Sequence, residues 1–524
     1  MYDLIIENGK IVDGTGAPAF SADLAIQGER IVKIGNLEAA SSKKKINAEG
    51  FVVCPGFIDP HGHFDLLIEY FPACENGVIQ GITTFVGGNC GMSTVLETPD
   101  QFNFPEFLTR IESAGFGINF APLIGHGAVR GRVIGNDYKR TATAPEIEAM
   151  KRLVAEAMQN GAFGLSTGLD YNPTMHSSTE EVIELAKVAQ KYGGIYATHH
   201  RFLQSKWPAD AQGETSYSSY PGDVTEVWFG RYHGLMEAIE IAKAANIPLQ
   251  VSHLYNVYRT PQPHPELLDL ATANATLWLI DQAAEAGVDI AFDRMVTYQD
   301  IQGAKPIINE FLVADIAGLK FAKELGREAF LEKLQDPDFR DRIKQLSEDG
   351  GLKLLFSNTK ADPYWMDRLI IVNCTKTDYV DKTIGDLARK AGKDPLDVIF
   401  DLMILDNDVA YHQFQDEKEI TEANLPLYLN HPLCMPCSDL LSYPSLQTPL
   451  SDLDPIAVAQ VIQNINSPHT YNMYPYFIGK YIREKRHYAA GRSDSQINFH
   501  GGETIRHERA GSRLPGEFCR SGHI

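Results

Sequence analysis

From Gly56 onward the sequence repeats one pattern: a short apolar segment, a loop with polar residues, and then a stretch with helical spacing. The apolar segments 163–167, 195–198 and 249–252 are followed in turn by the helical stretches 179–186, 235–245 and 277–286. Repeated units of this kind form a parallel sheet covered by helices, and about eight of them close a barrel. The sequence therefore predicts an α/β fold with a (β/α)8 TIM barrel.

Polar residues that can bind metal follow the ends of these apolar segments. The stretch 55–65 contains His61 and His63 after a β-branched, apolar run, and alternate residues of a strand point the same way. Two imidazoles on one face indicate a metal site, whereas hydrogen-bonded core histidines are the alternative. The complete set of strand-end candidates is His61, His63, Cys90, His199, His253 and Asp439.

Zinc is the metal that this set of donors favours. It takes nitrogen and thiolate ligands, and it keeps an open position for water in catalytic sites. A thiolate at Cys90 would bind zinc tightly, and such a residue is otherwise hard to explain at the end of a buried strand. Asp439 has the chemistry to accept a proton from water and deliver it to a leaving group.

Three other segments differ from the barrel pattern. Residues 3–53 alternate short apolar runs with turn signals such as Asn8-Gly9, which predicts a β-meander too small to be stable without strands from elsewhere. Segments 202–232 and 294–365 are longer than ordinary connections, and the second contains the helical stretch Ile316 to Leu325. Both could be lids over the barrel or surface decoration.

Composition limits the partners. The net charge of −21 over 524 residues argues against nucleic acid and anionic membranes and favours small-molecule ligands. The sequence has neither a membrane-spanning apolar run nor a signal-peptide pattern at its start, so we expect a cytoplasmic protein. Seven scattered cysteines do not resemble a disulfide framework, and Cys434 and Cys437 are interpreted as structural thiols.

Several motifs together resemble the amidohydrolase superfamily. Pro-Gly-Phe-Ile-Asp-x-His-x-His at 55–63 follows a short β segment, as in that superfamily. The further motifs are similar to its N-acyl-D-amino-acid deacylase (D-aminoacylase) family, and they occur in the same order over most of the chain. They lie at 80–84 with 88–91, 123–127, 164–171, 192–194, 198–201, 252–253 and 438–439.

This resemblance implies a distorted barrel with a small β-sandwich built from both ends of the chain. It implies one zinc ion held tightly by Cys90, His199 and His253. His61 and His63, with Asp439, would surround a second position that is empty or weakly filled. The implied reaction is amide hydrolysis, in which zinc polarises the acyl carbonyl and Asp439 carries a proton from water to the departing nitrogen.

The chain departs from the family at three places. Tyr255 stands where the family usually has a lysine that helps to bind the substrate carboxylate, Phe202 and Leu203 replace acidic residues, and Cys437 and Leu440 flank Ser438-Asp439 in place of glycines. The hydrolytic residues are therefore retained while the substrate pocket differs. The candidates for substrate recognition are Tyr171, Arg201, Tyr255, Tyr298 and Arg368, each with a packing or surface role as the alternative.

His126 is a candidate for the pocket wall or for supporting a metal ligand, with a structural hydrogen bond in its Gly-His-Gly loop as the alternative. The expected division is 1–55 for the first part of the sandwich and 56–480 for the barrel with its insertions. Residues 481–524 would complete the sandwich, and from 487 this segment is expected to be aberrant or disordered.

The tail from His487 has no apolar periodicity, although the family continues with a helix, an Arg-Phe-Gly element and a final strand of the Ala-Asp-Leu-Val type. Back-translation of the tail, read one nucleotide later, permits a string that contains all three. We therefore hypothesise a single-nucleotide insertion near the codons for Arg486 and His487. Resequencing of this region tests the hypothesis.

The leading hypothesis is a zinc-dependent hydrolase of N-acyl amino acids, favouring the D configuration. The alternatives are a cyclic-amide or carbamoyl amidohydrolase of the same superfamily, and a non-catalytic scaffold on the same barrel. Dinuclear relatives of the first kind commonly use a carboxylated lysine as bridging ligand, whereas Cys90 occupies that role here. The sequence leaves homo-oligomerisation open.

Overall fold

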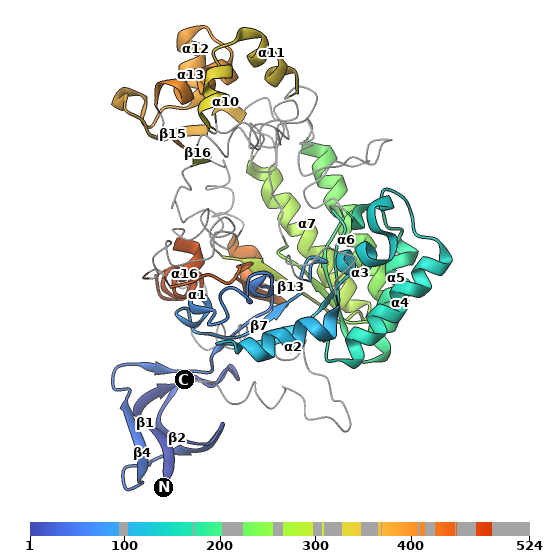
Figure 1. Ribbon diagram of the computed structural model, residues 1–524. Helices are drawn as coiled ribbons and strands as arrows, with labels where there is room; N and C mark the ends of the chain where they lie inside the picture. Colours follow the sequence, from blue (N-terminus) through green and yellow to red (C-terminus); the bar gives the residue numbers. More distant parts are fainter. Residues whose placement is uncertain are drawn as a thin grey trace.

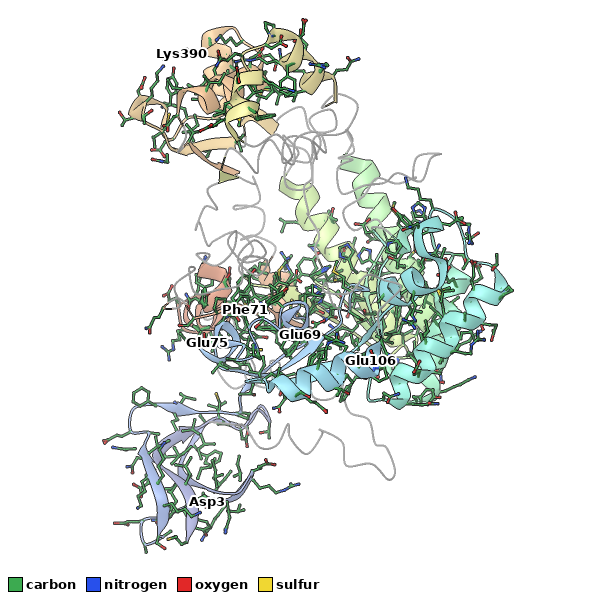
Figure 2. The ribbon with its side chains drawn as sticks, in the orientation of Figure 1. Asp3, Glu69, Phe71, Glu75, Glu106 and Lys390 are labelled. Atoms are coloured by element: carbon green, nitrogen blue, oxygen red, sulfur yellow. The ribbon has the colours of Figure 1, made fainter. Side chains whose placement is uncertain are left out.

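A computed structural model of the chain describes residues 1–93, 103–170, 173–201, 224–254, 266–296, 307–308, 327–346, 365–367, 369–406, 409–413, 425–445, 447 and 468–484. The described residues form three parts, a small N-terminal sheet, a barrel and a lobe of helices (Figure 1). In Figure 2, Asp3 marks the sheet, Glu106 the barrel and Lys390 the lobe.

The barrel contains eight parallel strands in the described part of the chain. These are β6 (Phe57–Asp59), β7 (Ile82–Gly87), β8 (Asn119–Pro122) continued by β9 (Ile124–Gly125), β10 (Gly164–Gly168), β11 (Ile195–His199), β12 (Leu249–Val251), β13 (Ile290–Met295) and β17 (Cys434–Cys437). Each strand pairs with the next in chain order, and Leu123 N, between β8 and β9, donates to Gly87 O at 2.9 Å.

The first and last strands close the ring. His63 and Leu441 form a parallel bridge just beyond β6 and β17, and His63 N donates to Leu440 O at 2.7 Å. The expected TIM barrel is therefore confirmed. Since all strands are parallel, their carboxyl ends lie at one rim, which is where such barrels carry their functional residues.

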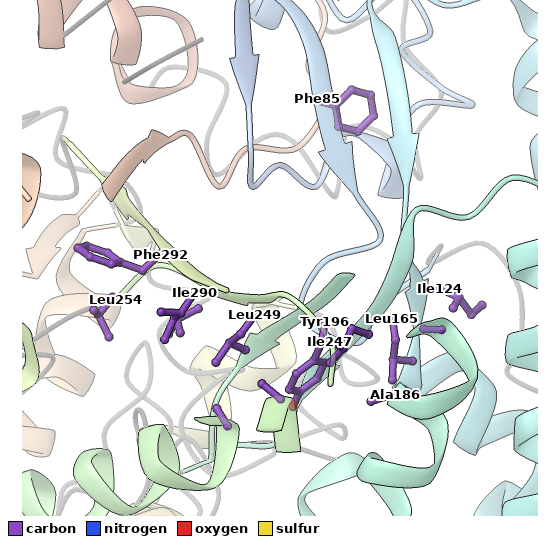
Figure 3. Close-up of a cluster of buried hydrophobic side chains, with 14 of the residues drawn as sticks. Phe85, Ile124, Leu165, Ala186, Tyr196, Ile247, Leu249, Leu254, Ile290 and Phe292 are labelled. Carbon is purple, nitrogen blue, oxygen red and sulfur yellow. The ribbon is translucent and has the colours of Figure 1, made fainter. Parts of the chain in front are cut away.

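Helices cover the outside of the barrel, and their buried apolar side chains pack in its core. They are α2 (Phe104–Ala114), α3 (His126–Ile134), α4 (Ala144–Gln159), α5 (Thr179–Lys191), α6 (Val224–Ala245) and α7 (Glu266–Glu285). In α5, Val182, Leu185 and Ala189 are fully buried at helical spacing, and the Ser178 side chain caps the first turn. Figure 3 shows the apolar side chains from neighbouring strands, such as Leu165, Leu249 and Ile290, that form the core beside these helices.

The N-terminal sheet comprises β1 (Tyr2–Ile11), β2 (Phe20–Gln27), β3 (Arg30–Gly35), β4 (Ser42–Asn47) and β5 (Val52–Val53). It departs from the expected meander, because β4 and β5 both pair with β1 in parallel. Asn8-Gly9, expected as a turn, is instead a bulge inside β1, where Asn8 has a φ of 63° and the register shifts.

The C-terminal segment is described only as far as Glu484. The π-helix η8 (Phe477–Glu484) follows α16 (Pro468–Tyr476), and its Tyr481 is buried in the core of the barrel. Residues 485–524, including the suspected frame change and the strands expected to complete the sandwich, lie outside the described residues. The division of the chain into domains and the frame-change hypothesis stay predictions.

In the sequence, the lobe lies between the seventh and eighth strands of the barrel, β13 and β17. It has its own hydrophobic core, which includes Phe330, Ile371 and Phe400. Its elements are β14 (Ile307–Ile308), α10 (Arg327–Lys333), α11 (Pro337–Leu346), β15 (Leu369–Asn373), α12 (Ile384–Ala391), α13 (Pro395–Leu405) and β16 (Ala410–Gln413). The insertion thus continues beyond the expected range 294–365. The helix expected at 316–325 lies outside the described residues.

The other expected insertion, 202–232, is only partly described, since α6 begins at Val224. Among the helices within the described ranges, none combines the length and the apolarity that crossing a bilayer requires.

Candidate metal centre

The six strand-end candidates lie together at the carboxyl rim of the barrel. His199 is the last residue of β11, and the others follow the ends of β6, β7, β12 and β17 by two to four residues: His61 and His63, Cys90, His253, and Asp439. The parallel strands therefore bring these residues together, although they are far apart in the sequence.

A first group of ligand atoms surrounds the Cys90 thiol. Its Sγ lies 3.4 Å from His61 Nε2 and 3.4 Å from His253 Nε2, and the ligand atoms of these three residues all lie within 4.8 Å of one another. His199 Nδ1 lies 3.1 Å from the same His253 nitrogen. One thiolate and several imidazoles this close together fit the donor set of a zinc ion.

A second group shares His61 with the first. Asp439 Oδ1 lies 3.4 Å from His61 Nε2 and 3.2 Å from His63 Nε2. Because His61 belongs to both groups, the two potential metal positions would be neighbours. The family resemblance placed His61 only at the second position, whereas the structure also sets its ring against Cys90.

Three residues of the site have left-handed backbones, an arrangement that neither sequence nor spacing indicated. The φ angles are 55° for Cys90, 33° for His253 and 53° for Asp439. Such conformations are uncommon for residues with a Cβ and persist only where the surroundings hold them. Each of the three residues lies two or three positions after the end of a strand.

Two buried carboxylates support the histidine rings and were missed by the sequence analysis. Asp170 Oδ2 lies 3.4 Å from His199 Nε2, which leaves Nδ1 of that ring directed at His253. Asp293 Oδ1 lies 3.3 Å from His61 Nδ1 and accepts the backbone N–H of His253 at 2.6 Å. A carboxylate on the second ring nitrogen fixes the tautomer and orientation of a ligating histidine.

A usable signal for both residues was their position, since Asp293 ends the apolar segment 289–293 and Asp170 lies in the motif at 164–171.

The electrostatics of the metal-free site favour an ionised thiol and carboxylate. Burial alone would raise the pKa of Cys90, but the charges of His61 and His253 outweigh it and hold this pKa well below its usual value. Burial likewise opposes ionisation of Asp439, yet hydrogen bonds from His61 and His63 hold its pKa well below the usual range. The site is therefore charged before any metal binds.

The pKa values of His63 and His199 are raised instead. Burial would lower the pKa of His63, but hydrogen bonds with Asp439 and Cys90 raise it to about 10. The pKa of His199 rises to about 9 for the same reason, with Asp170 and Cys90 as partners. A metal ion would replace the protons on these rings, because only neutral imidazole coordinates.

Arg201 is the one described residue among the five substrate-binding candidates. Its Nε donates to Glu237 at 2.8 Å, and its Nη1 and Nη2 donate to the carbonyls of Met175 at 2.7 Å and Ser177 at 3.0 Å. These contacts tie β11 to α6 and to the loop before α5. Tyr171, Tyr255, Tyr298 and Arg368 lie outside the described residues. Substrate recognition by all five stays a prediction.

His126 supports a buried ion pair. Its Nε2 lies 2.8 Å from Glu181 Oε1, and both oxygens of Glu181 accept Arg130 Nη1 at 2.7 Å. All three side chains are buried. This arrangement agrees with the structural alternative for His126, since it links the start of α3 to α5.

Cys434 and Cys437 lie on β17 as free, buried thiols, and burial raises the pKa of both well above the usual value. Inert thiols of this kind agree with the structural role expected for the pair.

Comparison with known proteins identifies relatives whose names describe related activities. No protein-family model matches the chain. D-aminoacylase of Alcaligenes xylosoxydans xylosoxydans is 32% identical over 308 residues, which cover 56% of this chain and 57% of that protein. N-acyl-D-aspartate deacylase of the same organism is 39% identical over 216 residues, covering 38% and 43%. The chain thus matches about half the length of these relatives.

Solved structures of the same group share the fold. A crystal structure of D-aminoacylase superposes with a TM-score of 0.61 at 22% identity, covering 96% of this chain and 86% of that one. N-acyl-D-glutamate deacylase of Bordetella bronchiseptica gives a TM-score of 0.61 at 23% identity with the same coverage. The sequence similarity, the common fold and the resemblance in motifs agree: over the matched half of its length the chain is similar to members of the D-aminoacylase family of the amidohydrolase superfamily, and it shares their fold.

Proposed function

We propose that this protein is a zinc-dependent hydrolase that cleaves the amide bond of N-acyl-D-amino acids and releases a carboxylate and a free amino acid. One observation carries the proposal: Cys90, His61, His199 and His253 converge at the barrel rim, and Asp439 lies against the histidines at its edge. The names of the relatives, D-aminoacylase, N-acyl-D-glutamate deacylase and N-acyl-D-aspartate deacylase, support the substrate class.

Cys90, His199 and His253 would hold the tightly bound zinc ion. The ionised thiol supplies the negative charge, and Asp170 keeps Nδ1 of His199 turned toward the other donors. When bound, zinc polarises a carbonyl group and acidifies water, which is the chemistry that amide hydrolysis needs.

Asp439 would move the proton. Its ionised carboxylate lies against the histidines of the site, where it can accept a proton from the attacking water. The water oxygen forms a bond to the acyl carbon, and the carbon–nitrogen bond then breaks. Asp439 returns its proton to the departing nitrogen, so that the products are a carboxylate and an amine. His61 and His63 orient the Asp439 carboxylate through Oδ1.

A second, weaker zinc position would use His61, His63 and Asp439. The binuclear centre of a solved D-aminoacylase is described by one-metal activation and second-metal attenuation. The same behaviour would follow here, because a second ion on Asp439 would occupy the oxygen that must carry the proton.

A substrate panel tests the proposal. Freshly purified protein is analysed for zinc and assayed with N-acetyl and N-formyl derivatives of D- and L-amino acids, alongside N-carbamoyl and cyclic amides. We expect about one zinc ion per chain, activity on linear N-acyl-D-amino acids, and its loss in Asp439→Asn.

Activity confined to L-isomers would refute the proposed preference for the D configuration. A preference for cyclic amides would favour the alternative function, that of a cyclic-amide hydrolase. Protein that contains no zinc and takes up none would refute the enzymatic function. A cytoplasmic location and a homo-oligomeric state remain proposals beside this one.

A further inference from the structure

Asp59 is a fully buried carboxylate at the end of β6 that the hydrolytic reaction does not use directly. Its Oδ1 accepts the backbone N–H groups of Ser438 at 3.1 Å and His61 at 3.3 Å. Its Oδ2 accepts the hydroxyl of Ser438. Three donors on one carboxylate therefore join the first strand of the barrel to the residue just before Asp439.

Ser438 also contacts Leu440, the residue that follows Asp439. Its side chain is completely buried, and its Oγ accepts Leu440 N at 3.2 Å. Asp439 itself donates its backbone N–H to His61 O at 2.8 Å. The residues on both sides of Asp439 are thus held, and the left-handed backbone of Asp439, with a φ of 53°, is fixed between them.

The same bonds set the position of the Asp439 carboxylate. They align the ends of β6 and β17, and His61 and Asp439 then face each other with 3.4 Å between Nε2 and Oδ1. A strand-end residue without these contacts would relax from its left-handed backbone, and its side chain would turn away from the histidines. Among the described residues of the site, Asp59 is the carboxylate that contacts both Ser438 and the His61 backbone.

We infer that Asp59, acting through Ser438, is a positioning residue that aims Asp439 for proton transfer to the leaving nitrogen, an inference that rests on the proposed hydrolytic function. Asp59 is not among the groups that could hold a metal ion, because its carboxylate contacts Ser438 and the His61 backbone instead. Through its contacts with Ser438, it fixes the position of the Asp439 carboxylate. Loss of either contact should therefore affect the step that needs the proton more than it affects zinc binding.

The test compares wild type, Asp59→Asn and Ser438→Ala in the zinc-loaded full chain. Substrates are an N-acyl-D-amino acid and its ester analogue, in which oxygen replaces the amide nitrogen. An amine needs a proton to depart, whereas an alcohol needs it less. We expect kcat on the amide to fall about 10- to 100-fold with KM and zinc content little changed, as for loss of other outer partners of catalytic groups. The loss on the ester should be smaller.

Asp406→Asn is the matched control. Asp406 is also a buried carboxylate that accepts a backbone N–H, from Thr375 at 2.5 Å, but it belongs to the lobe. A purely structural effect would lower amide and ester rates equally, by reducing the folded fraction, and that result in both site variants would overturn the inference. Ser438→Ala covers the case in which Asp59→Asn does not fold.

A crystal structure of Ser438→Ala decides the matter independently of activity. An Asp439 carboxylate that keeps its contacts with His61 and His63 would overturn the inference, and a displaced carboxylate would support it. A wild-type protein that fails to hydrolyse any amide refutes the proposed function instead. That outcome is distinguished from failure of the inference by the crystallographic comparison.

Discussion

At the scale of single residues, Cys90 is the centre of the site because its sulfur lies against histidines from two other strands. We predict that Cys90→Ala loses both zinc and turnover, since the thiolate is the negatively charged donor of the first group. The loss of zinc affinity should exceed the roughly 10- to 100-fold that removal of an outer partner costs. His63→Asn, at the edge of the site, should lower turnover by about 100-fold while most zinc remains.

Cys74→Ala is the control for these measurements. Cys74 is a buried cysteine with a left-handed backbone, as Cys90 is, but it lies in the hydrophobic core and is not among the possible metal ligands. Zinc content by mass spectrometry and kcat measured on the same samples separate the effects. Equal losses of zinc in Cys90→Ala and His63→Asn would contradict the assignment of tight binding to Cys90.

The raised histidine pKa values predict how zinc affinity depends on pH. With values of about 10 for His63 and about 9 for His199, both rings are protonated at pH 7 in the metal-free protein. Protons therefore compete with the tightly bound zinc ion at His199 and with the weaker one at His63, and the affinity of the tight position should rise with pH up to about pH 9. Histidines with ordinary values near 6.5 would stop competing near neutrality.

Competition with a chromophoric chelator between pH 6.5 and 9 measures this dependence. An affinity that is constant above pH 7 would contradict the prediction.

The single residues also show where sequence reasoning stops. His61 and His63 could be placed on one face from alternation alone, and the strand-end positions brought Cys90 and Asp439 to the same rim. The carboxylates Asp170 and Asp293 could not be recognised in this way. Their function depends on which ring nitrogen they contact across neighbouring strands, and spacing along the chain does not contain that information.

At the scale of elements, α3 and α5 are held together by the buried contacts of Glu181 with His126 and Arg130. We predict that Glu181→Gln lowers the free energy of unfolding by about 3–5 kcal/mol, because it leaves the Arg130 guanidinium buried without its counter-charge. Urea denaturation followed by circular dichroism measures this loss.

Glu184→Gln on the same helix is the matched control. Glu184 pairs with Lys151 and Lys187 at the surface, where its side chain is 37% exposed. Its replacement should cost less than about 1 kcal/mol. Similar losses in the two variants would show that the buried contacts do not carry the packing of α5.

Elements of the barrel were predictable because their periodicity is strong. The expected strand at 195–198 is β11, Ile195–His199, and the expected helix at 179–186 is the first part of α5. Asn8-Gly9 shows the opposite case. The pair has the turn chemistry expected of a hairpin. However, β1 pairs with β2 both before and after Asn8-Gly9, so these two residues form a bulge within the strand. Tertiary pairing decided between two local structures that the residues allow equally.

At the scale of the whole molecule, the site depends on closure of the ring. Asp59 and Ser438 are 379 residues apart in sequence, yet their contact joins the first strand to the last. The lobe and all other barrel strands lie between them in the chain. Because this contact joins the first strand to the last, the position of the proton carrier depends on closure of the ring.

The N-terminal sheet gives the last prediction, because Ile31, Val32 and Ile34 of its edge strand β3 are exposed in the described structure. If the sequence after Arg486 is out of frame, the frame-restored chain should cover such apolar surface and melt higher, by at least about 2–4 °C. Thermal melts of the zinc-loaded proteins measure the difference. A chain ending at Glu484 is the control and should melt like the present one, because an out-of-frame tail stabilises nothing. Equal melting of all three would show that the segment after Arg486 has no part in completing the sheet, and resequencing would then be expected to return the present frame.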